Sequence, residues 1–524
     1  MRKLAAMLGL ISVLCAFGAG APAQPVGAVA SKVVDETSAA LTARLVRALG
    51  IAGRHERVGA AREILSDAGY NFRIGIAEDA RLPRAEGLAA PPAQPHILPL
   101  AIVAGSPGIP RNKAFLAELS SAQAGHARVI VLSRGAYTLA QVAKALAGQG
   151  DNNSVLINAQ GASINLPIYV GPQAELTIGS QDASTVILNA AKGAFIASAG
   201  RLSIRDTAIS GSVGLNRHPH HDQGFGPFLL IGDGGTLIAR NTVFARLGSW
   251  QHPFGVGLLN ASADSSIAGN QFSGTYGLRI ENTANAAVTE NEFGNLLGPA
   301  IHVLHASGAA IHGNFIHWAA GGPGILLGEN AAGSRVSGNV LLFNGSGIVA
   351  AMDGGGNIIE GNAVVASSGA GIGLRGRHCN LVRGNHLLAN LGDGVAWRGG
   401  AADVVGNRIA FNRAAGVSSP RTGAADSGQT GELFLKDNYF QKNRVGLRID
   451  VAAGVALENN SFSRQSPRLI AGQLGAETGT IMRAGVRRVQ FAAEGRTGFK
   501  PRVTSGIAHE PDGCMAGAIG VEVN

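Results

Sequence analysis

Two histidines and three arginines occupy related positions in a repetitive sequence and could perform acid–base chemistry on an anionic substrate. They are Arg279, His302, His305, Arg375 and Arg398. A neutral imidazole can remove a proton as a general base, whereas a guanidinium binds a carboxylate through paired N–H donors. Such a group suits the removal of a weakly acidic proton beside a carboxylate, because the cation stabilises the negative charge that develops.

These residues belong to a repeat of asparagine, any residue and an apolar residue. Its asparagines are Asn270, Asn291, Asn314, Asn339, Asn362, Asn385, Asn407, Asn438 and Asn460. Their separations are 21, 23, 25, 23, 23, 22, 31 and 22 residues. A second series, a glycine or alanine followed by an apolar residue, keeps the same spacing from position 277 to position 446. A period of about 22 residues with short apolar segments is too short for a helical repeat or a propeller blade.

The two series predict an all-β chain, a right-handed parallel β-helix with coils of about 22 to 23 residues. The strands of each coil would pair with those of the coils above and below, and the turn asparagines would bond one another in a ladder. We therefore interpret the repeated asparagines and glycines as structural, with the glycines supplying positive φ at a turn. The long step before Asn438 predicts a loop within residues 418–431.

Alignment of the coils predicts which side chains share a face. Arg279 and His302 take the same strand position on consecutive coils, about 4.8 Å apart. They alternate with Leu278 and Ile301, which point inward, so both should point outward. His305 reaches this face only if its strand has ended before it.

Arg375 and Arg398 lie two positions further along their strands, and Glu281 takes the corresponding position nearer the start. We predict that these three residues bind the substrate, that the two histidines with Arg279 carry catalysis, and that all of them line one trough for an anionic chain. The alternative for each residue is an ordinary solvated side chain.

The remaining histidines suggest structural roles. His312 and His317 adjoin the asparagine repeat, and the His218-Pro-His-His-Asp222 cluster lies in an expected loop. No Cys/His spacing is typical of a metal site. We predict neither a metal nor an organic cofactor.

The first residues indicate export. A basic start at 1–3 is followed by an uncharged apolar run over 4–17 and by the small-x-small pattern Ala21-Pro-Ala23. Residues 1–23 are therefore predicted to be a signal peptide. No later run is apolar and long enough to span a bilayer, so we expect a periplasmic or secreted protein without a transmembrane segment in the mature chain.

Charge and cysteine content restrict the partners. The net charge is +9 although only 15% of the residues are charged. A positive excess on an exported protein suits an anionic partner, such as an acidic polysaccharide, an envelope surface or a nucleic acid. Aromatic residues make up 5% and are not interleaved with basic runs, so we expect no nucleic-acid partner. Cys379 and Cys514 are the only cysteines after the signal and allow one disulfide at most.

The chain divides by composition. Residues 24–125 are predicted to form an N-terminal region, with helical spacing over 38–68 and a Pro-rich linker or extended segment over 81–111. A helix of this region would cap the open first coil. The β-helix is placed at 126–465 and a C-terminal tail at 466–524.

Several segments outside the regular repeats are distinctive: Ile164–Pro172, Gly193–Ile196, Gly200–Ile204, Gly226–Leu230, Gly234-Gly235 and Leu247-Gly248. Together they resemble the coils of the periplasmic mannuronan C5-epimerases of alginate-producing bacteria. The resemblance runs in register from about residue 130 to residue 465.

The resemblance implies conversion of mannuronate to guluronate within an acidic exopolysaccharide, beginning with removal of the C5 proton and using no organic cofactor. The family carries an Asp-Pro-His-Asp motif after the Gly-Ile of one coil. The matching coil here reads Ala300-Ile-His-Val-Leu-His305 and does not retain that motif. Basic residues of the family before the next Gly-Ile are replaced by Trp318–Pro323.

Two other functions stay open. A uronate lyase would remove the same proton and then expel the C4 oxygen, whereas a glycosidase needs paired carboxylates. Glu281, Asp353 and Asp450 lie on separate coils, which ranks hydrolysis below elimination. A non-catalytic scaffold that binds polysaccharide during secretion, with other envelope secretion proteins as partners, would need only the fold and a positive face.

Overall fold

The computed structural model describes residues 40–70, 92–103, 113–212, 225–419 and 431–501, apart from a few short gaps inside these ranges. The predicted signal peptide, the 218–222 cluster and most of the expected 418–431 loop lie outside the described residues.

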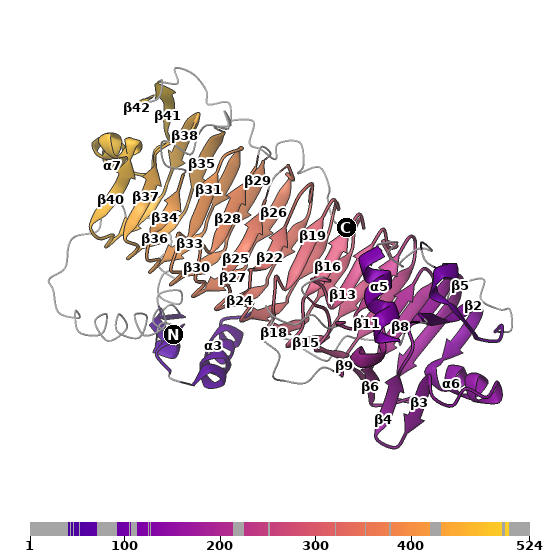
Figure 1. Cartoon of the computed structure of the whole chain (residues 1–524). Helices are drawn as coiled ribbons and strands as arrows, with labels where there is room; N and C mark the ends of the chain where they lie inside the picture. Colours follow the sequence, from indigo (N-terminus) through magenta and orange to yellow (C-terminus); the bar gives the residue numbers. More distant parts are fainter. Residues whose placement is uncertain are drawn as a thin grey trace, which may run out of the picture.

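The chain is a right-handed parallel β-helix, as predicted (Figure 1). Each coil has three faces. Face 1 consists of β7 (Ile196–Ser198), β10 (Leu229–Gly232), β13 (Val256–Leu259), β16 (Leu278–Glu281), β19 (Ile301–Leu304), β22 (Pro323–Leu327), β25 (Ser346–Ala350), β28 (Ile372–Arg375), β31 (Val395–Arg398), β34 (Ala415–Ser418), β37 (Val445–Ile449) and β40 (Arg468–Gly472). Face 2 consists of β8 (Arg201–Arg205), β11 (Thr236–Arg240), β14 (Ser266–Ala268), β17 (Ala287–Thr289), β20 (Ala310–His312), β23 (Arg335–Ser337), β26 (Asn357–Glu360), β29 (Asn380–Arg383), β32 (Ala402–Val405), β35 (Glu432–Lys436) and β38 (Gly454–Glu458).

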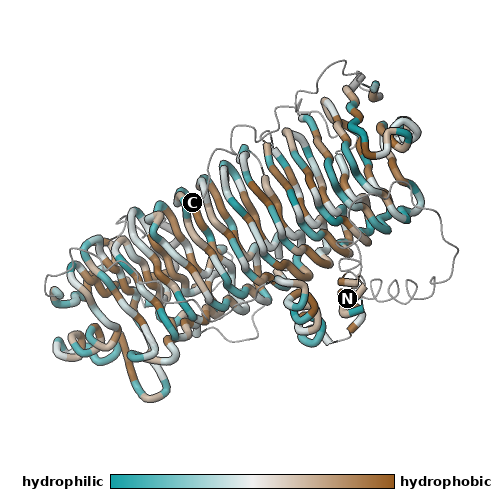
Figure 2. Tube along the Cα trace, turned by 180° about the vertical axis from the view of Figure 1, so that it is seen from behind, coloured by the Kyte–Doolittle hydropathy of each residue, from teal (hydrophilic) through white to brown (hydrophobic). Residues whose placement is uncertain are grey.

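Face 3 is a separate sheet. Its parallel strands after the first hairpin are β6 (Thr185–Leu188), β9 (Ala208–Gly211), β12 (Val243–Ala245), β15 (Gln271–Ser273), β18 (Glu292–Gly294), β21 (Phe315–His317), β24 (Val340–Leu342), β27 (Ala363–Val365), β30 (His386–Leu388), β33 (Arg408–Ala410), β36 (Tyr439–Gln441) and β39 (Ser461–Ser463). Buried apolar residues alternate with outward-facing residues along the strands. Hydrophobic positions recur from coil to coil along the stack (Figure 2).

The asparagine repeat forms the predicted ladder. The Nδ2 group of Asn270 donates to Oδ1 of Asn291 at 3.0 Å, and the same bond continues from coil to coil as far as Asn460. The bond from Asn407 to Asn438 is 3.0 Å long in spite of the 31-residue step. The extra residues therefore leave the coil without disturbing its stacking.

The glycines of face 1 have a different role from the predicted one, because positive φ is found elsewhere. It occurs at the residue just before each ladder asparagine, such as Gly313 and Gly338. The glycines before the apolar residues of face 1 lack space for a side chain. A Cβ at Gly324 would lie 2.6 Å from Leu341, and one at Gly416 would lie 2.6 Å from Phe440.

A second ladder was missed by the sequence analysis. Asn390 donates to Asn412 at 2.9 Å and Asn412 donates to Asn443 at 2.9 Å. The ladder ends where the backbone N–H of Asn443 donates to Gln465 at 2.8 Å. Each member follows a member of the first ladder by five residues in the sequence, so the spacing carried this signal.

The first coil is capped by α6 (Leu139–Gly148), whose Leu139, Val142 and Leu146 are buried in the main core. Before it, β1 (His96–Pro99) pairs antiparallel with β2 (Arg128–Thr138), and α4 (Leu100–Val103) and α5 (Lys113–Ala122) follow β1. The hairpin of β3 (Val155–Asn158) and β4 (Gly161–Ile164) and the long strand β5 (Ile168–Gly179) start the stack.

The helix predicted within residues 38–68 exists as α3 (Arg54–Asp67), but its predicted position at the open end is wrong. It lies on the side of the stack (Figure 1), where Val58, Ala61 and Leu65 pack on the outward side chains of face 3. The reason is that face 3 is apolar on its outer side there, with Val340 and Leu342 among the contacts. The Tyr70 hydroxyl also lies 2.8 Å from Nδ1 of His386.

The other end of the stack is covered by the residues after β40. The 3-10 helix η2 (Gln473–Glu477) and α7 (Thr478–Ala484) lead to the antiparallel strands β41 (Val489–Glu494) and β42 (Gly498–Pro501). β41 pairs antiparallel with β38 and so closes face 2. Cys379, in the turn before β29, is disulfide-bonded. Within the described part of the chain, no helix has the length and apolarity needed to cross a membrane.

Candidate functional site

The paired strands β16 and β19 place Arg279 directly beside His302, as the alignment of coils predicted. Both side chains alternate with the buried Leu278 and Ile301 and therefore lie on the outer side of face 1. The coils before them are covered: Leu100 of α4, Leu119 of α5 and an aromatic group around Phe228 pack together over β7 and β10. Among the described residues, this cover of face 1 ends before β16.

Arg279 is already bound to a carboxylate of its own strand. Its Nε donates to Oε2 of Glu281 at 2.9 Å and its Nη2 lies 2.7 Å from the same oxygen. Both side chains are about a quarter exposed, at 27% and 21%. A guanidinium has five N–H donors, so donors remain for a second carboxylate.

His302 is the most perturbed of the predicted catalytic residues. Burial and the neighbouring Arg279 guanidinium lower its pKa to about 4, although Glu281 acts in the opposite direction. The imidazole is therefore neutral at ordinary pH and can accept a proton. Gly328 of the following coil makes room for it, because a Cβ there would lie 3.1 Å from the imidazole Nε2. Sequence reasoning missed Gly328, which carries no functional group of its own.

His305 lies just beyond the end of β19, as the sequence analysis required for it to reach this face. Its backbone has a φ of 46°, and Asn330 Nδ2 donates to its Nδ1 at 3.2 Å. Its Nε2 lies 3.9 Å from a carboxylate oxygen of Glu329. Its side chain is 38% exposed, so it is more open to solvent than His302.

Arg375 and Arg398 are neighbours on β28 and β31, as predicted, and both are exposed. Arg398 donates through Nη1 to the backbone oxygen of Ser419 at 3.1 Å. They are not close to Arg279, however, because four coil steps of about 4.8 Å separate β16 from β28, which makes about 19 Å. The five residues thus form two charged groups on one face.

The surface between the two charged groups is apolar or small. The outward positions of the intervening and adjoining strands hold Leu326, Val349, Gly373 and Ala396 in register with His302. These four positions carry no charged side chain. This surface could accept the apolar faces of sugar rings while the charged groups hold carboxylates at either end.

The carboxylates of face 1 do not form a facing pair. Glu281 is bound to Arg279, and Asp450 Oδ2 accepts from Arg448 Nε at 3.1 Å. Asp353 lies on a different coil with a φ of 57°. The geometry required for two-carboxylate hydrolysis is therefore not found in the described part of this face.

The histidines that were interpreted as structural lie away from face 1. His312 Nδ1 lies 3.0 Å from the Ser337 hydroxyl on the outer side of face 2. His317 Nε2 lies 3.0 Å from Glu292 on face 3, and Arg62 of α3 lies 3.7 Å from the same carboxylate. The His312–Ser337 and His317–Glu292 contacts each join neighbouring coils, and the Arg62–Glu292 contact anchors α3.

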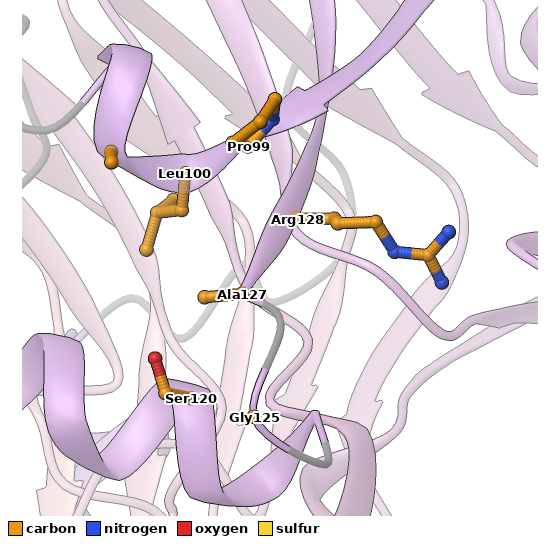
Figure 3. A pocket seen from close by; sticks show the side chains of 7 residues that line it. Pro99, Leu100, Ser120, Gly125, Ala127 and Arg128 are labelled. Carbon is orange, nitrogen blue, oxygen red and sulfur yellow. The ribbon is translucent and has the colours of Figure 1, made fainter.

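A hollow of about 470 Å³ lies between α4, α5 and the start of β2 (Figure 3). Leu100, Ala127 and Ser120 line it, while the Arg128 side chain extends away from Leu100 and Ser120. It is mostly apolar and belongs to the covered end of the stack. It therefore does not belong to the charged groups of face 1.

Comparison with solved structures confirms the resemblance at the level of the fold. The crystal structure of the periplasmic alginate epimerase AlgG matches with a TM-score of 0.59 and 18% identity, covering 74% of this chain and 95% of that one. A double mutant of the same enzyme matches with a TM-score of 0.62 and 20% identity, covering 74% and 99%. At such identities the likeness establishes the parallel β-helix.

A family described as periplasmic copper-binding protein (NosD) matches residues 265–466. No curated protein matches the chain. Among the described residues, no three His, Cys, Asp or Glu side chains gather closely enough to hold a metal ion. The described residues therefore do not fit a copper site.

Proposed function

We propose that the protein is an extracytoplasmic polysaccharide-modifying enzyme of the mannuronan C5-epimerase type, which binds an acidic exopolysaccharide along face 1. The observation that carries this proposal is the Arg279–His302 pair on consecutive coils, where an anion-binding cation adjoins a neutral, partly desolvated imidazole. The AlgG likeness supports the same reading, because that enzyme is a periplasmic alginate epimerase on the same fold.

In the proposed reaction, Arg279 meets the uronate carboxylate with the donors that Glu281 leaves free. His302 then removes the C5 proton, and the guanidinium stabilises the enolate-like charge on the carboxylate. A proton from solvent then adds to the opposite side of C5 and gives the epimer, and His302 releases the proton that it took to solvent. Binding of the substrate carboxylate also raises the basicity of His302, because a nearby negative charge favours the imidazolium.

The second charged group would extend the binding surface. Arg375 and Arg398 lie about 19 Å and about 24 Å from Arg279 and would hold carboxylates of sugars further along the same chain. His305 contacts Glu329 and Asn330 and would lie at the edge of the reaction centre, where it would assist His302.

A non-catalytic scaffold is the second candidate, and the Arg279–Glu281 ion pair favours it. A guanidinium that is already neutralised is a weaker partner for a substrate carboxylate than a free one. In that case face 1 would bind polymer during secretion without changing it.

Purified protein incubated with polymannuronate distinguishes the candidates by proton NMR. Guluronate signals support the epimerase, and unsaturated chain ends indicate a lyase. Binding without any chemical change supports the scaffold. A protein that neither binds nor changes any polyuronate contradicts the proposal.

A further inference from the structure

Four basic residues gather where face 3 turns into face 1 at the last two coils. Lys442 and Arg444 follow β36, and Arg464 and Arg468 lie between β39 and the first residue of β40. All four side chains are exposed. We refer to Lys442, Arg444, Arg464 and Arg468 as the basic corner.

The coil register sets like charges side by side in the basic corner. Gln441 of β36 pairs with Ser463 of β39, and the N–H of Lys442 donates to the oxygen of Ser463 at 2.9 Å. Lys442 and Arg464 therefore take equivalent positions on consecutive coils, with backbones about 4.8 Å apart. Like charges at directly opposed positions repel one another, so a bound anion would stabilise this arrangement.

Two cations on the flat faces nearby are arranged differently, because each lies beside a carboxylate. Lys436 lies 2.9 Å from Glu458, and Arg448 lies 3.1 Å from Asp450. In the basic corner, by contrast, no carboxylate from the described ranges contacts any of the four cations. Lys442 instead lies over the ring of Phe411, with its Nζ 5.2 Å from the ring centroid.

The outer side of face 3 changes from apolar to polar at the same coils. Beneath α3 it is apolar and covered, up to Leu388 and Ala410. On β36 and β39 the outward residues are Tyr439, Gln441, Ser461 and Ser463, none of which belongs to the apolar cluster that α3 covers. Hydroxyls, an amide and an aromatic ring are the groups that bind sugars, and they adjoin the basic corner.

We propose that the basic corner, with the polar strip of β36 and β39, is a second attachment site for the acidic polysaccharide. The inference rests on the proposed function and adds a contact surface away from His302. Six coil steps separate β19 from β37, or about 29 Å, so only a long chain reaches both places. Two linked contacts on one polymer raise its affinity above that of either contact alone.

The test uses the full chain with Lys442→Gln, Arg444→Gln and Arg464→Gln combined, and measures affinity for long-chain polymannuronate and for a short mannuronate oligomer at low salt. The expected result is a loss of about tenfold or more for the long polymer. Any turnover of the short oligomer, which reaches only the Arg279–His302 pair, should stay unchanged.

The matched control is Arg134→Gln, Lys144→Gln and Lys192→Gln, which removes three exposed cations at the opposite end of the stack. It should keep wild-type affinity. Anionic lipid vesicles and single-stranded DNA serve as further probes. Loss of binding to these probes with unchanged binding to polymannuronate would overturn the inference.

The proposed function and the second attachment site are contradicted by different results. A wild-type protein that binds no polyuronate overturns the proposed function and this inference together. Wild-type binding with the same affinity in both triple variants overturns only the second attachment site.

Discussion

The imidazole of His302 and the backbone of Gly328 lie against each other on consecutive coils, with so little space that a Cβ at 328 would come within 3.1 Å of the imidazole Nε2. It would also come within 2.6 Å of Leu304. The position of the imidazole thus depends on the absence of a side chain on the next coil.

Gly328→Ala should therefore displace His302 while leaving the stack folded. A displacement of the order of 1 Å can lower turnover by about 100-fold, so we expect a loss of at least about tenfold in kcat. Gly179→Ala on face 2 is the control, because its Cβ would lie at an ordinary 3.6 Å from the backbone oxygen of Arg205, away from face 1. Equal kcat values in the two variants would show that the position of His302 is unimportant.

His302→Gln and His305→Gln separate the two histidines. Loss of a general base lowers turnover by about 100-fold or more, which we expect for His302. For His305 we expect less than about a threefold loss, because it is exposed and held beside Glu329. Steady-state kinetics on polymannuronate, with circular dichroism to verify folding, measure both. A larger loss of turnover for the His305 variant than for the His302 variant would indicate that His305, and not His302, is the general base.

The asparagine ladder should carry measurable stability. Asn339→Leu removes the bonds that Nδ2 makes to Ile311 and Asn362, and it leaves the N–H of Asn314 without its acceptor. We expect a loss of about 1–3 kcal/mol in the free energy of unfolding. Urea denaturation of the variant and the wild type measures it, and equal midpoints with equal slopes would contradict a structural role.

Stability should fall as the pH drops from about 6.5 to about 4. The native pKa values of His302 and His386 are both lowered to about 4, mainly by burial, whereas an unfolded histidine titrates near 6.5. In this window the unfolded chain binds more protons than the native one, so protonation favours unfolding. Each histidine contributes of the order of 1–3 kcal/mol by this linkage.

Urea midpoints measured across this pH range test the linkage. His386→Gln should make the dependence of stability on pH shallower by about one proton. A variant with the wild-type slope would show that His386 does not titrate as the buried environment requires.

The fold was predictable from the sequence because its period is encoded twice, in the asparagines and in the glycine–apolar pairs. The Arg279–His302 neighbourhood followed directly from that register. The role of the face 1 glycines was not predictable in the same way, since it depends on how closely Leu341 or Phe440 approaches from another face. Nor did the sequence reveal that α3 lies on face 3 rather than on the first coil, because both places offer apolar contacts to an amphipathic segment.

The distance between the two charged groups was not evident from the strand positions alone. Position within a coil placed Arg375 and Arg398 on the correct face, but only the number of intervening coils shows that they lie about 19 Å and about 24 Å from Arg279. The ion pair between Arg279 and Glu281 depends on rotamers that sequence spacing does not determine.

The most direct test of C5 proton removal by His302 is solvent deuterium incorporation at C5 of polymannuronate. It is followed by proton NMR in deuterated water with the wild type and with His302→Gln. We expect deuterium at C5 together with guluronate signals for the wild type, and a loss of about 100-fold in both for the variant. Wild-type protein that binds the polymer but incorporates no deuterium, or a variant that incorporates it at the wild-type rate, would contradict proton removal by His302.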